Sequence, residues 1–305
     1  MRGGKEKMTL KGKRIGVFGK GGAGKSTVTV LLAQALRMRG YSVCVLDADS
    51  TNLGLFQIFE VHRSPRPLMD YFGGMVFSGG SVTCPVDDPL PLAAAEIELE
   101  TLSPEYYARN PEGIILFIAG KIGDQGPGAG CDGPVAKIAR DFRIYIKDES
   151  PITIVDFKAG FEDTARGVLT SLDSAIVVVD PTIASVELAA NMKHMVEQIK
   201  ADVLPATAHL ENSELIAWAN KIFIEACIED IWVVLNRVHS ADEEEYLRQK
   251  LREKEIQPVG AIYHSLPISI SWLKGIPIRV EDALADVQKI LDKLESAEQV
   301  TGERG

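Results

Sequence analysis

The sequence predicts a doubly wound α/β fold, in which helices flank a mostly parallel sheet. Short apolar runs rich in β-branched residues recur along the chain, and segments with helical periodicity lie between them. The runs are apolar at consecutive positions, as expected for strands that are covered on both faces. In such folds the ligand lies beyond the carboxyl ends of the strands. The expected strands are Arg14–Phe18, Ser42–Leu46, Gly113–Ala119, Ile152–Val155, Ser174–Val179, Ile231–Leu235 and Val259–Tyr263.

The segments between these strands have the residue spacing of helices that cover a sheet. We read residues 1–10 as a flexible tail and residues 11–305 as a single domain, because 305 residues with 46% hydrophobic content can bury one large core. Two stretches, at about 60–110 and 201–228, are expected to be insertions. The expected helices are Ser26–Arg39, Pro134–Ile144, Ser185–Ala201, Ser213–Ala226, Ala241–Glu253 and Val280–Ala297.

The charge of the chain restricts its partners. A net charge of -10 argues against holding nucleic acid by non-specific phosphate contacts, which need clustered Lys and Arg. No apolar run approaches the roughly 18 residues that span a bilayer, and the polar face of the last expected helix is mainly acidic. We therefore expect a cytoplasmic protein without a membrane partner. In a reducing compartment its four cysteines would be free thiols or metal ligands.

The glycine-rich segment Gly19–Thr27 lies between the first expected strand and the first expected helix. Strand, loop and helix in this order form the context of a phosphate-binding loop, whose N–H groups turn toward the β-phosphate. Lys25 would reach the β- and γ-phosphates, and the Ser26 hydroxyl would bind Mg²⁺. The predicted nucleotide-binding residues of the loop are Gly21, Gly22, Ala23, Gly24, Lys25, Ser26 and Thr27.

Lys20 is an additional lysine near the start of this loop. The pattern Lys-Gly-Gly-x-Gly-Lys-Ser resembles the deviant Walker A loop of the SIMIBI class of P-loop ATPases, which includes MinD, ParA and the nitrogenase iron protein. The resemblance implies a P-loop NTPase fold that binds ATP or ADP with Mg²⁺. It also implies that Lys20 acts in catalysis together with Lys25, reaching across a homodimer to the nucleotide of the partner.

Three aspartates follow expected strands. Asp47 and Asp49 lie in a segment that resembles switch I of this class, where Asp49 would orient the attacking water and Asp47 would brace the loop near the metal. Asp156 follows the run Ile152–Val155 and matches the Walker B carboxylate that holds a Mg²⁺-bound water. The predicted Mg²⁺ site therefore comprises Ser26, Asp47, Asp49 and Asp156, directly or through water. Capping of a helix or turn is the alternative role for Asp47 and Asp49.

Two residues late in the chain match positions that contact the base in similar proteins. Asn236 follows the strand expected at Ile231–Leu235, and by resemblance it would hydrogen-bond adenine. Pro267 follows the last expected strand and would pack on the base. A turn-forming role is the alternative for Asn236.

A segment around Cys131 resembles one branch of this class of ATPases. The strand that ends in Gly120-Lys121-Ile122, followed by Gly130-Cys131-Asp132-Gly133-Pro134, resembles CooC-type ATPases, which assist nickel insertion into carbon monoxide dehydrogenase. Those proteins have a second cysteine where this chain has Gly133. The segment is also similar to the cluster-binding segment of the nitrogenase iron protein, whose second cysteine would correspond to Asp163.

Cys131 and Asp163 are therefore candidate ligands for a divalent metal such as Ni²⁺ or Zn²⁺ at a dimer interface. The alternative is that Cys131 is a packed thiol. The resulting hypothesis is a Mg²⁺-dependent ATPase that forms a nucleotide-bridged homodimer and matures a metalloenzyme client such as carbon monoxide dehydrogenase. A ParA- or MinD-type partition ATPase remains an alternative, and a reductase like the nitrogenase iron protein is disfavoured because a carboxylate is a poor cluster ligand.

Overall fold

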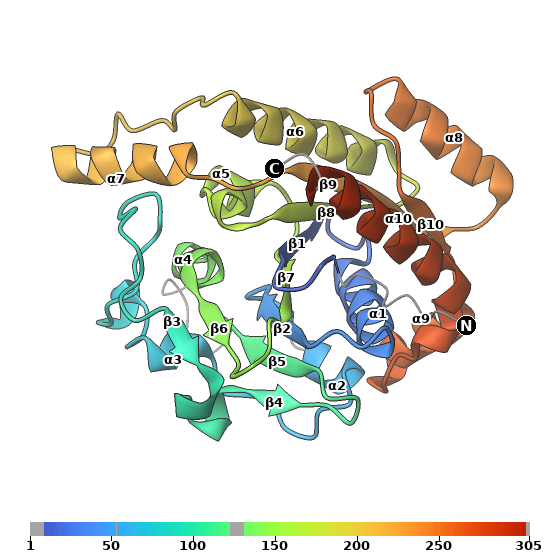
Figure 1. Cartoon of the computed structure of the whole chain (residues 1–305), viewed down its shortest axis with the longest axis horizontal. Coiled ribbons are helices and arrows are strands. Elements are labelled where there is room, and N and C mark those ends of the chain that lie inside the picture. The colour runs from blue at the N-terminus through green and yellow to red at the C-terminus, as the bar shows by residue number, and fades with distance from the viewer. Residues whose placement is uncertain (1–8, 53, 123–130, 303–305) are drawn as a thin grey trace.

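The computed structural model describes residues 9–52, 54–122 and 131–302. Its centre is an eight-stranded sheet with the order β10-β9-β8-β1-β7-β2-β5-β4 (Figure 1). Every pairing in this sheet is parallel except the one between β4 and β5. The mostly parallel α/β architecture predicted from the sequence is thereby confirmed. The strands are β1 (Arg14–Gly19), β2 (Val43–Ala48), β4 (Ala108–Arg109), β5 (Ile115–Ile118), β7 (Ile152–Phe157), β8 (Ser174–Val179), β9 (Asp230–Val238) and β10 (Gly260–Tyr263).

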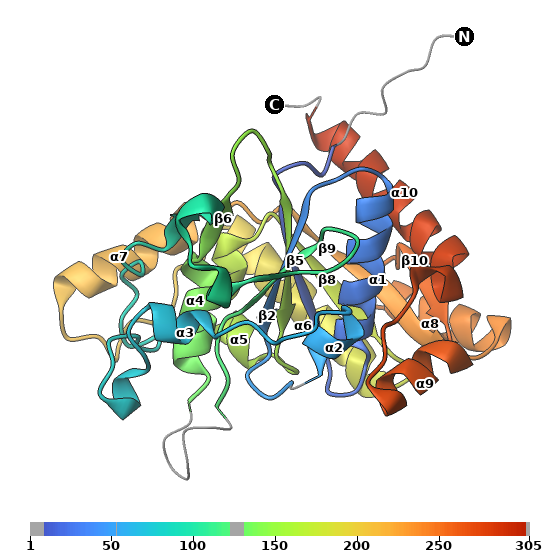
Figure 2. The same ribbon diagram turned by 90° about the horizontal axis from the view of Figure 1, so that it is seen from below.

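Helices cover both faces of the sheet, with α1 and α10 on one side and α4 and α5 on the other (Figures 1 and 2). Neighbouring residues of β1 serve different faces, since Val17 belongs to the core under α1 and Phe18 to the core under α4. This double burial explains why the strands are continuously apolar. The helices are α1 (Lys25–Met38), α2 (Leu55–Ile58), α3 (Leu68–Tyr71), α4 (Gly133–Asp141), α5 (Glu162–Ala165), α6 (Ile183–Lys200), α7 (Ser213–Ile224), α8 (Ala241–Arg252), α9 (Leu266–Lys274) and α10 (Leu284–Gly302).

Two helices predicted from the sequence have wrong bounds. The one expected over Val280–Ala297 begins at Leu284, after a 3-10 turn at Val280–Ala283, and ends at Gly302. The helix expected over Pro134–Ile144 ends at Asp141, because Phe142 has an extended backbone with ψ 128°. Residues 142–145 then alternate between buried and more exposed positions, which is the period of a strand. They lead into β6 (Arg143–Tyr145), which pairs in parallel with β3 (Glu96–Glu98) in a second, two-stranded sheet. Helix α9 was not predicted at all.

The two stretches expected to be insertions contain their own short elements. The first holds α3, β3, β4 and 3-10 helices at Val76–Ser78, Leu99–Thr101 and Pro104–Tyr106. The second holds α7, which lies at the far left of Figure 1 and exposes Ile224. Two further 3-10 turns lie at Val168–Ser171 and Val280–Ala283. The helices in the described part of the chain are too short or too polar to cross a membrane.

Candidate functional site

The loop after β1 has the backbone of a phosphate cradle. Gly22 and Gly24 have φ values of 81° and 92°, a region that side chains with a Cβ rarely adopt. Gly24 is also crowded, since a Cβ there would lie 2.2 Å from the Asn236 Nδ2 atom. Glycine is therefore required at Gly24 for two independent reasons. The loop leads directly into α1, so the N–H groups of the first helical turn face the space above the loop.

The two lysines of the loop differ in burial. The Lys25 residue is only 6% exposed, whereas Lys20 is half-buried. Within the described residues, neither ammonium group has a hydrogen bond or an ion pair. A buried ammonium without a partner is costly unless an anion compensates it. The phosphate contact predicted for Lys25 and the trans role predicted for Lys20 both remain predictions.

Two buried aspartates lie side by side at the carboxyl edge of the sheet. Asp47 on β2 and Asp156 on β7 are register partners, and both are at most 2% exposed. Burial raises the pKa of Asp47 to about 7 and that of Asp156 to about 6. Ser26 donates a hydrogen bond of 2.6 Å to Asp156 Oδ2. Asn52 donates one of 3.0 Å to the Ser26 hydroxyl.

These oxygen donors fit a Mg²⁺ site, since Mg²⁺ prefers carboxylates, hydroxyls and water. Ser26 and Asp156 would hold the ion, which would favour the ionised form of the buried carboxylates. Asp49 is less buried than Asp47, and its Oδ1 atom accepts hydrogen bonds from the backbone N–H and the hydroxyl of Thr51. This turn contact is compatible with the capping role considered for Asp49, and its predicted role in water orientation stays a prediction.

Lys121 is a site residue to which the sequence analysis gave no role. Its ammonium donates to Asp47 Oδ2 at 2.7 Å and to the backbone oxygen of Asp49 at 2.6 Å. The contact lowers the pKa of Asp47, but burial outweighs it. Lys121 therefore ties the switch I segment to the end of β5. The only sequence signal was the Gly-Lys-Ile pattern used for the family resemblance.

A small cavity of about 160 Å³ lies next to the loop, between the ends of β9 and β10 and helix α9. Asn236 lines this cavity, but its amide Nδ2 donates to the Ala23 carbonyl oxygen at 2.8 Å. Asn236 therefore braces the phosphate loop, and its contact with adenine stays a prediction. Pro267 is exposed and lies at the start of α9, outside the set of residues that line the cavity.

Two further residues of this cavity were missed from the sequence. Trp272 of α9 donates its indole N–H to the Thr27 hydroxyl at 2.8 Å. Arg237 donates to the Gly22 carbonyl oxygen at 2.5 Å. Both side chains come from segments more than 200 residues away in the chain, so no local motif indicated their contact with the loop.

The candidate metal ligands have different surroundings. The Cys131 thiol is half-buried, and its Sγ accepts the Gly133 backbone N–H at 3.4 Å. The Asp163 carboxylate accepts a hydrogen bond of 2.9 Å from Arg166, and burial raises its pKa to about 6. Among the described residues of one chain, no three His, Cys, Asp or Glu side chains are grouped as a metal site would require. A metal role for Cys131 and Asp163 remains a prediction that needs a second subunit.

Cys84, in the first insertion, packs against Gly133. A Cβ at Gly133 would lie 2.7 Å from the Cys84 Sγ atom, so a side chain at position 133 and the Cys84 thiol would collide. The thiol of Cys84 thus occupies the space that a side chain at position 133 would need. Cys44, Cys84, Cys131 and Cys227 are all free thiols, as expected. Residues 128–130 of the cysteine segment lie outside the described residues.

Asp132 links the cysteine segment to two switch segments: switch I, which contains Asp49, and the segment after Asp156, which we call switch II. Its carboxylate accepts hydrogen bonds from the Ser50 hydroxyl, next to Asp49, and from the Lys158 ammonium, which follows Asp156 by two residues. Side-chain hydrogen bonds to Lys158 and Ser50 keep the pKa of Asp132 low even though burial acts to raise it. The residue adjacent to Cys131 is therefore in direct contact with both sides of the nucleotide site.

Comparisons with known proteins agree with this geometry. The CbiA family, described as the CobQ/CobB/MinD/ParA nucleotide binding domain, matches residues 17–278. An uncharacterised ATP-binding protein of Methanocaldococcus jannaschii is 33% identical over 189 residues, which cover 61% of this chain and 74% of that protein. The carbon monoxide dehydrogenase accessory protein CooC of Rhodospirillum rubrum is 28% identical over 191 residues, covering 61% and 70%.

A solved structure gives the same fold. The MinD protein of Pyrococcus horikoshii, in complex with Mg-ADP, superposes with a TM-score of 0.58 at 16% identity and covers 94% of this chain and 98% of its own. At this identity the likeness concerns the fold. Together with the phosphate loop, the family match shows that the chain belongs to the CobQ/CobB/MinD/ParA nucleotide-binding family and is a P-loop ATPase.

Proposed function

We propose that this ATPase closes a Mg²⁺- and ATP-bridged homodimer and that closure controls a thiol site used to mature a metalloenzyme, with CooC-type nickel insertion as the leading role. The contact of Asp132 with both switch segments is the observation that carries the proposal. It gives the nucleotide site a direct connection to Cys131. The similarity to CooC of Rhodospirillum rubrum supports the same role.

In this proposal the chain's own groups hydrolyse ATP mainly by positioning and charge neutralisation. Lys25 neutralises the β- and γ-phosphate oxygens, and Lys20 of one subunit does so for the nucleotide of the other. Asp49 orients the attacking water. Ser26 and Asp156 would hold Mg²⁺, and the bound ion would supply neutralisation of the charge that develops on the phosphates.

The structural effect of hydrolysis would be transmitted to the cysteine segment through Asp132. When the γ-phosphate leaves, the switch segments that carry Ser50 and Lys158 relax, as they do in other P-loop switches. Because both residues hold the Asp132 carboxylate, a shift of either one changes the position of Cys131. The cargo site therefore responds to the nucleotide without a contact between metal and nucleotide.

The cargo would be a divalent cation such as Ni²⁺ or Zn²⁺, for which thiolates are suitable ligands. Cys131 of each subunit is the predicted ligand. Cys84 strengthens this proposal, because its thiol packs against Gly133 and can supply the second sulfur that position 133 lacks. Asp163 stays a candidate ligand, although it would first have to leave Arg166.

Metal binding with and without ATP tests the proposal. Equilibrium dialysis with Ni²⁺ and with Zn²⁺ would be run on the wild type and on the variants Cys131→Ala and Cys84→Ala, with Cys227→Ala as the matched control. We expect ATP-dependent metal uptake that both site variants lose and the control keeps. Metal uptake that is independent of Cys131 would remove the metal-carrier role.

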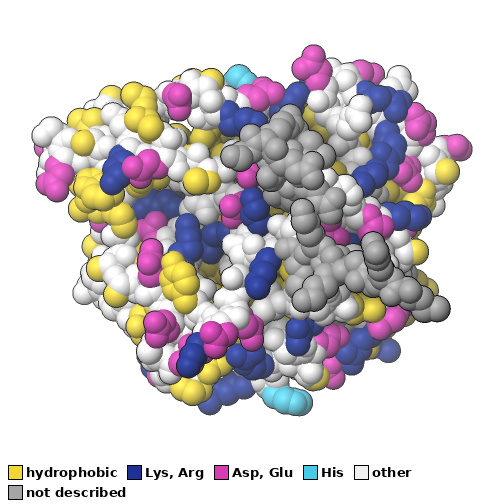
Figure 3. Space-filling view, viewed as in Figure 1, with side chains coloured by type: hydrophobic (Ala, Val, Ile, Leu, Met, Phe, Trp, Pro, Cys, Tyr) yellow, Lys and Arg dark blue, Asp and Glu magenta, His cyan; other side chains and the backbone are white. Residues whose placement is uncertain are grey.

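The alternative is a partition or positioning ATPase, which the fold likeness to MinD favours. Such a switch acts on DNA or a membrane surface, and both need a basic patch. In Figure 3, Lys and Arg side chains are interspersed with Asp and Glu on the described part of the face in view. ATP-dependent co-sedimentation with DNA or with anionic vesicles would establish this alternative in place of the metal-carrier role.

A further inference from the structure

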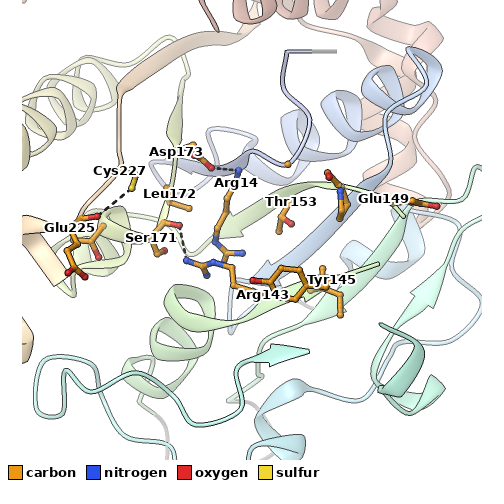
Figure 4. A pocket seen from close by; sticks show the side chains of 15 residues that line it. Arg14, Arg143, Tyr145, Glu149, Thr153, Ser171, Leu172, Asp173, Glu225 and Cys227 are labelled. Carbon is orange, nitrogen blue, oxygen red and sulfur yellow. Dashed lines mark hydrogen bonds between the residues drawn. The ribbon is translucent and has the colours of Figure 1, made fainter. Parts of the chain in front are cut away.

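A cavity of about 540 Å³ opens at the amino edge of the central sheet, opposite the edge that carries the phosphate loop. Its walls come from the start of β1, from β6 and the turn that precedes β7, and from the segment before β8 (Figure 4). The volume is within the range of small-molecule sites. We call it the amino-edge cavity, and it has no part in the function proposed above.

Two arginines, Arg14 and Arg143, form the middle of this cavity. Figure 4 shows their guanidinium groups next to each other. Arg14 is 95% buried, with a relative exposure of 5%, and its Nε atom is one of two buried side-chain N or O atoms without a hydrogen-bond partner among the described residues. A buried donor without a partner is rare in folded proteins and calls for an explanation.

The contacts of the two guanidinium groups are with backbone oxygens. Arg14 donates to the Ala139 carbonyl at 2.5 Å. Arg143 donates to the carbonyls of Arg140 and Phe142, at 2.7 and 3.0 Å, and to Ser171 at 3.2 Å. Three of these four carbonyls lie at the C-terminal end of α4, where cations are favourable. This capping explains where the arginines lie, while Arg14 Nε, which is closed off from solvent, has no acceptor among the described residues.

The carboxylates nearest the arginines, Asp141 and Asp173, attract both guanidinium charges but have their hydrogen bonds and ion pairs with other groups. Asp141 is held by Arg140 at 2.6 Å. Asp173 accepts the backbone N–H of Arg14 at 2.7 Å and lies 3.8 Å from the Lys13 ammonium. Burial, followed by repulsion from Arg143, lowers the pKa of Arg14. The two like charges therefore face each other without an ion pair to either guanidinium among the described side chains.

The remaining acidic residues of the cavity limit the size of a ligand's anionic part. Glu149 and Glu225 line opposite ends of the cavity, with the two arginines between them (Figure 4). A polyanion would meet these carboxylates, whereas one oxyanion group in the middle would not. Guanidinium groups bind carboxylate and phosphate oxygens with paired hydrogen bonds.

We propose that the amino-edge cavity binds a small molecule through a single oxyanion group, a phosphate or a carboxylate, held between Arg14 and Arg143. The hydroxyl of Thr153, which also lines the cavity, is a further donor within it. The ligand would occupy a site separate from that of the nucleotide, on the other edge of the same sheet.

Binding of inorganic phosphate and of acetate, which carries one carboxylate, tests this proposal and separates the two ligand classes. Both probes would be titrated calorimetrically at constant ionic strength into protein saturated with Mg-ADP, so that the phosphate loop is occupied. We expect saturable binding of at least one probe. The affinity should fall at least about tenfold in Arg143→Gln, because one charged fork is lost. The exposed residue Arg252 provides the matched control, Arg252→Gln, which should bind as the wild type does.

A second measurement uses only the wild type, so its result does not depend on whether a variant folds. Amide hydrogen exchange of residues 143–153, with and without the bound probe, should slow when the cavity is filled. Absence of saturable binding of both probes, binding that Arg143→Gln leaves unchanged, or unaltered exchange in residues 143–153 would each overturn the proposal and leave the arginines as caps of α4. None of these outcomes bears on ATP hydrolysis.

Discussion

The two edges of the central sheet carry opposite buried charges. At the carboxyl edge, Asp47 and Asp156 are register partners, and Lys121 and Ser26 contact them. At the amino edge, Arg14 and Arg143 contact backbone carbonyls. The first arrangement is suited to a cation with its nucleotide, and the second to an anion. Of these two polar edges of one sheet, only the carboxyl edge is marked by a recognisable sequence motif, the phosphate loop.

The largest expected effect comes from removing the buried lysine of the carboxyl edge. Lys25→Ala should lower kcat for ATP hydrolysis by about 10³-fold and weaken nucleotide binding, because this ammonium compensates the phosphates. A coupled ATPase assay and calorimetry with ADP would measure both. Lys289→Ala, at a lysine whose side chain is 74% exposed, is the control and should hydrolyse ATP normally. Near-normal hydrolysis by Lys25→Ala would show that the catalytic charge lies elsewhere.

The second prediction concerns Lys20→Ala, which separates nucleotide binding from assembly of the homodimer. We expect hydrolysis to fall by about 10²-fold, as when a charge supplied in trans is lost. The affinity for ADP should stay within about threefold, because Lys20 is predicted to contact the nucleotide of the other subunit and not its own. Single-turnover hydrolysis and ADP titration would measure the two effects. A parallel loss of ADP affinity would place Lys20 in its own subunit's site.

The third prediction concerns the contact between the carboxyl edge and the cysteine segment. Asp132→Asn keeps the shape of the side chain but removes the charge that holds Lys158. We expect ATP binding to change little, whereas the effect of an ATP analogue on Ni²⁺ affinity, about tenfold in the wild type, should disappear. Dialysis with both nucleotide states measures this, and Asp292→Asn, at an exposed carboxylate, serves as the control. Retained coupling in Asp132→Asn would mean that another route connects the sites.

The smallest effect is the pH dependence of the carboxyl edge. Burial raises the pKa of Asp156 to about 6, so protons occupy this carboxylate below pH 6 and must leave before Mg²⁺ binds. Mg²⁺ affinity in the presence of ADP should therefore rise with pH and be about tenfold weaker at pH 5 than at pH 8. Fluorescent-nucleotide titrations at each pH would measure it. Asp156→Asn should show weaker binding with a shallower slope, and an unchanged slope would assign the proton to another group.

The fold and the phosphate loop were predictable because their signals are local. Continuous apolar strands and the glycine spacing of Gly19–Thr27 are properties of neighbouring residues. Contacts between distant segments could not be read in this way. Trp272 contacts Thr27 across 245 positions, and Cys84 contacts Gly133 from the first insertion. The helix expected through Ile144 failed because burial of Phe142 in the core overrides helical periodicity.

The proximity of the amino-edge arginines, Arg14 and Arg143, could not be predicted from the sequence either. Arg14 follows Lys13 at the start of an apolar strand, and Arg143 lies within the helix expected over Pro134–Ile144. Their proximity depends on α4 ending at Asp141, which brings β6 to the start of β1 and β7. No spacing rule relates residues 129 positions apart, so the cavity became visible only from the structure.

Closure of a homodimer by ATP through Lys20 is tested by measuring the mass of the assembly in solution. Sedimentation velocity of the wild type and of Lys20→Ala would be compared with ADP and with a non-hydrolysable ATP analogue, each with Mg²⁺. We expect a dimer for the wild type with the analogue, a monomer with ADP, and a monomer for Lys20→Ala in both states. A wild type that remains monomeric with the analogue, or a Lys20→Ala variant that dimerises as the wild type does, would contradict it.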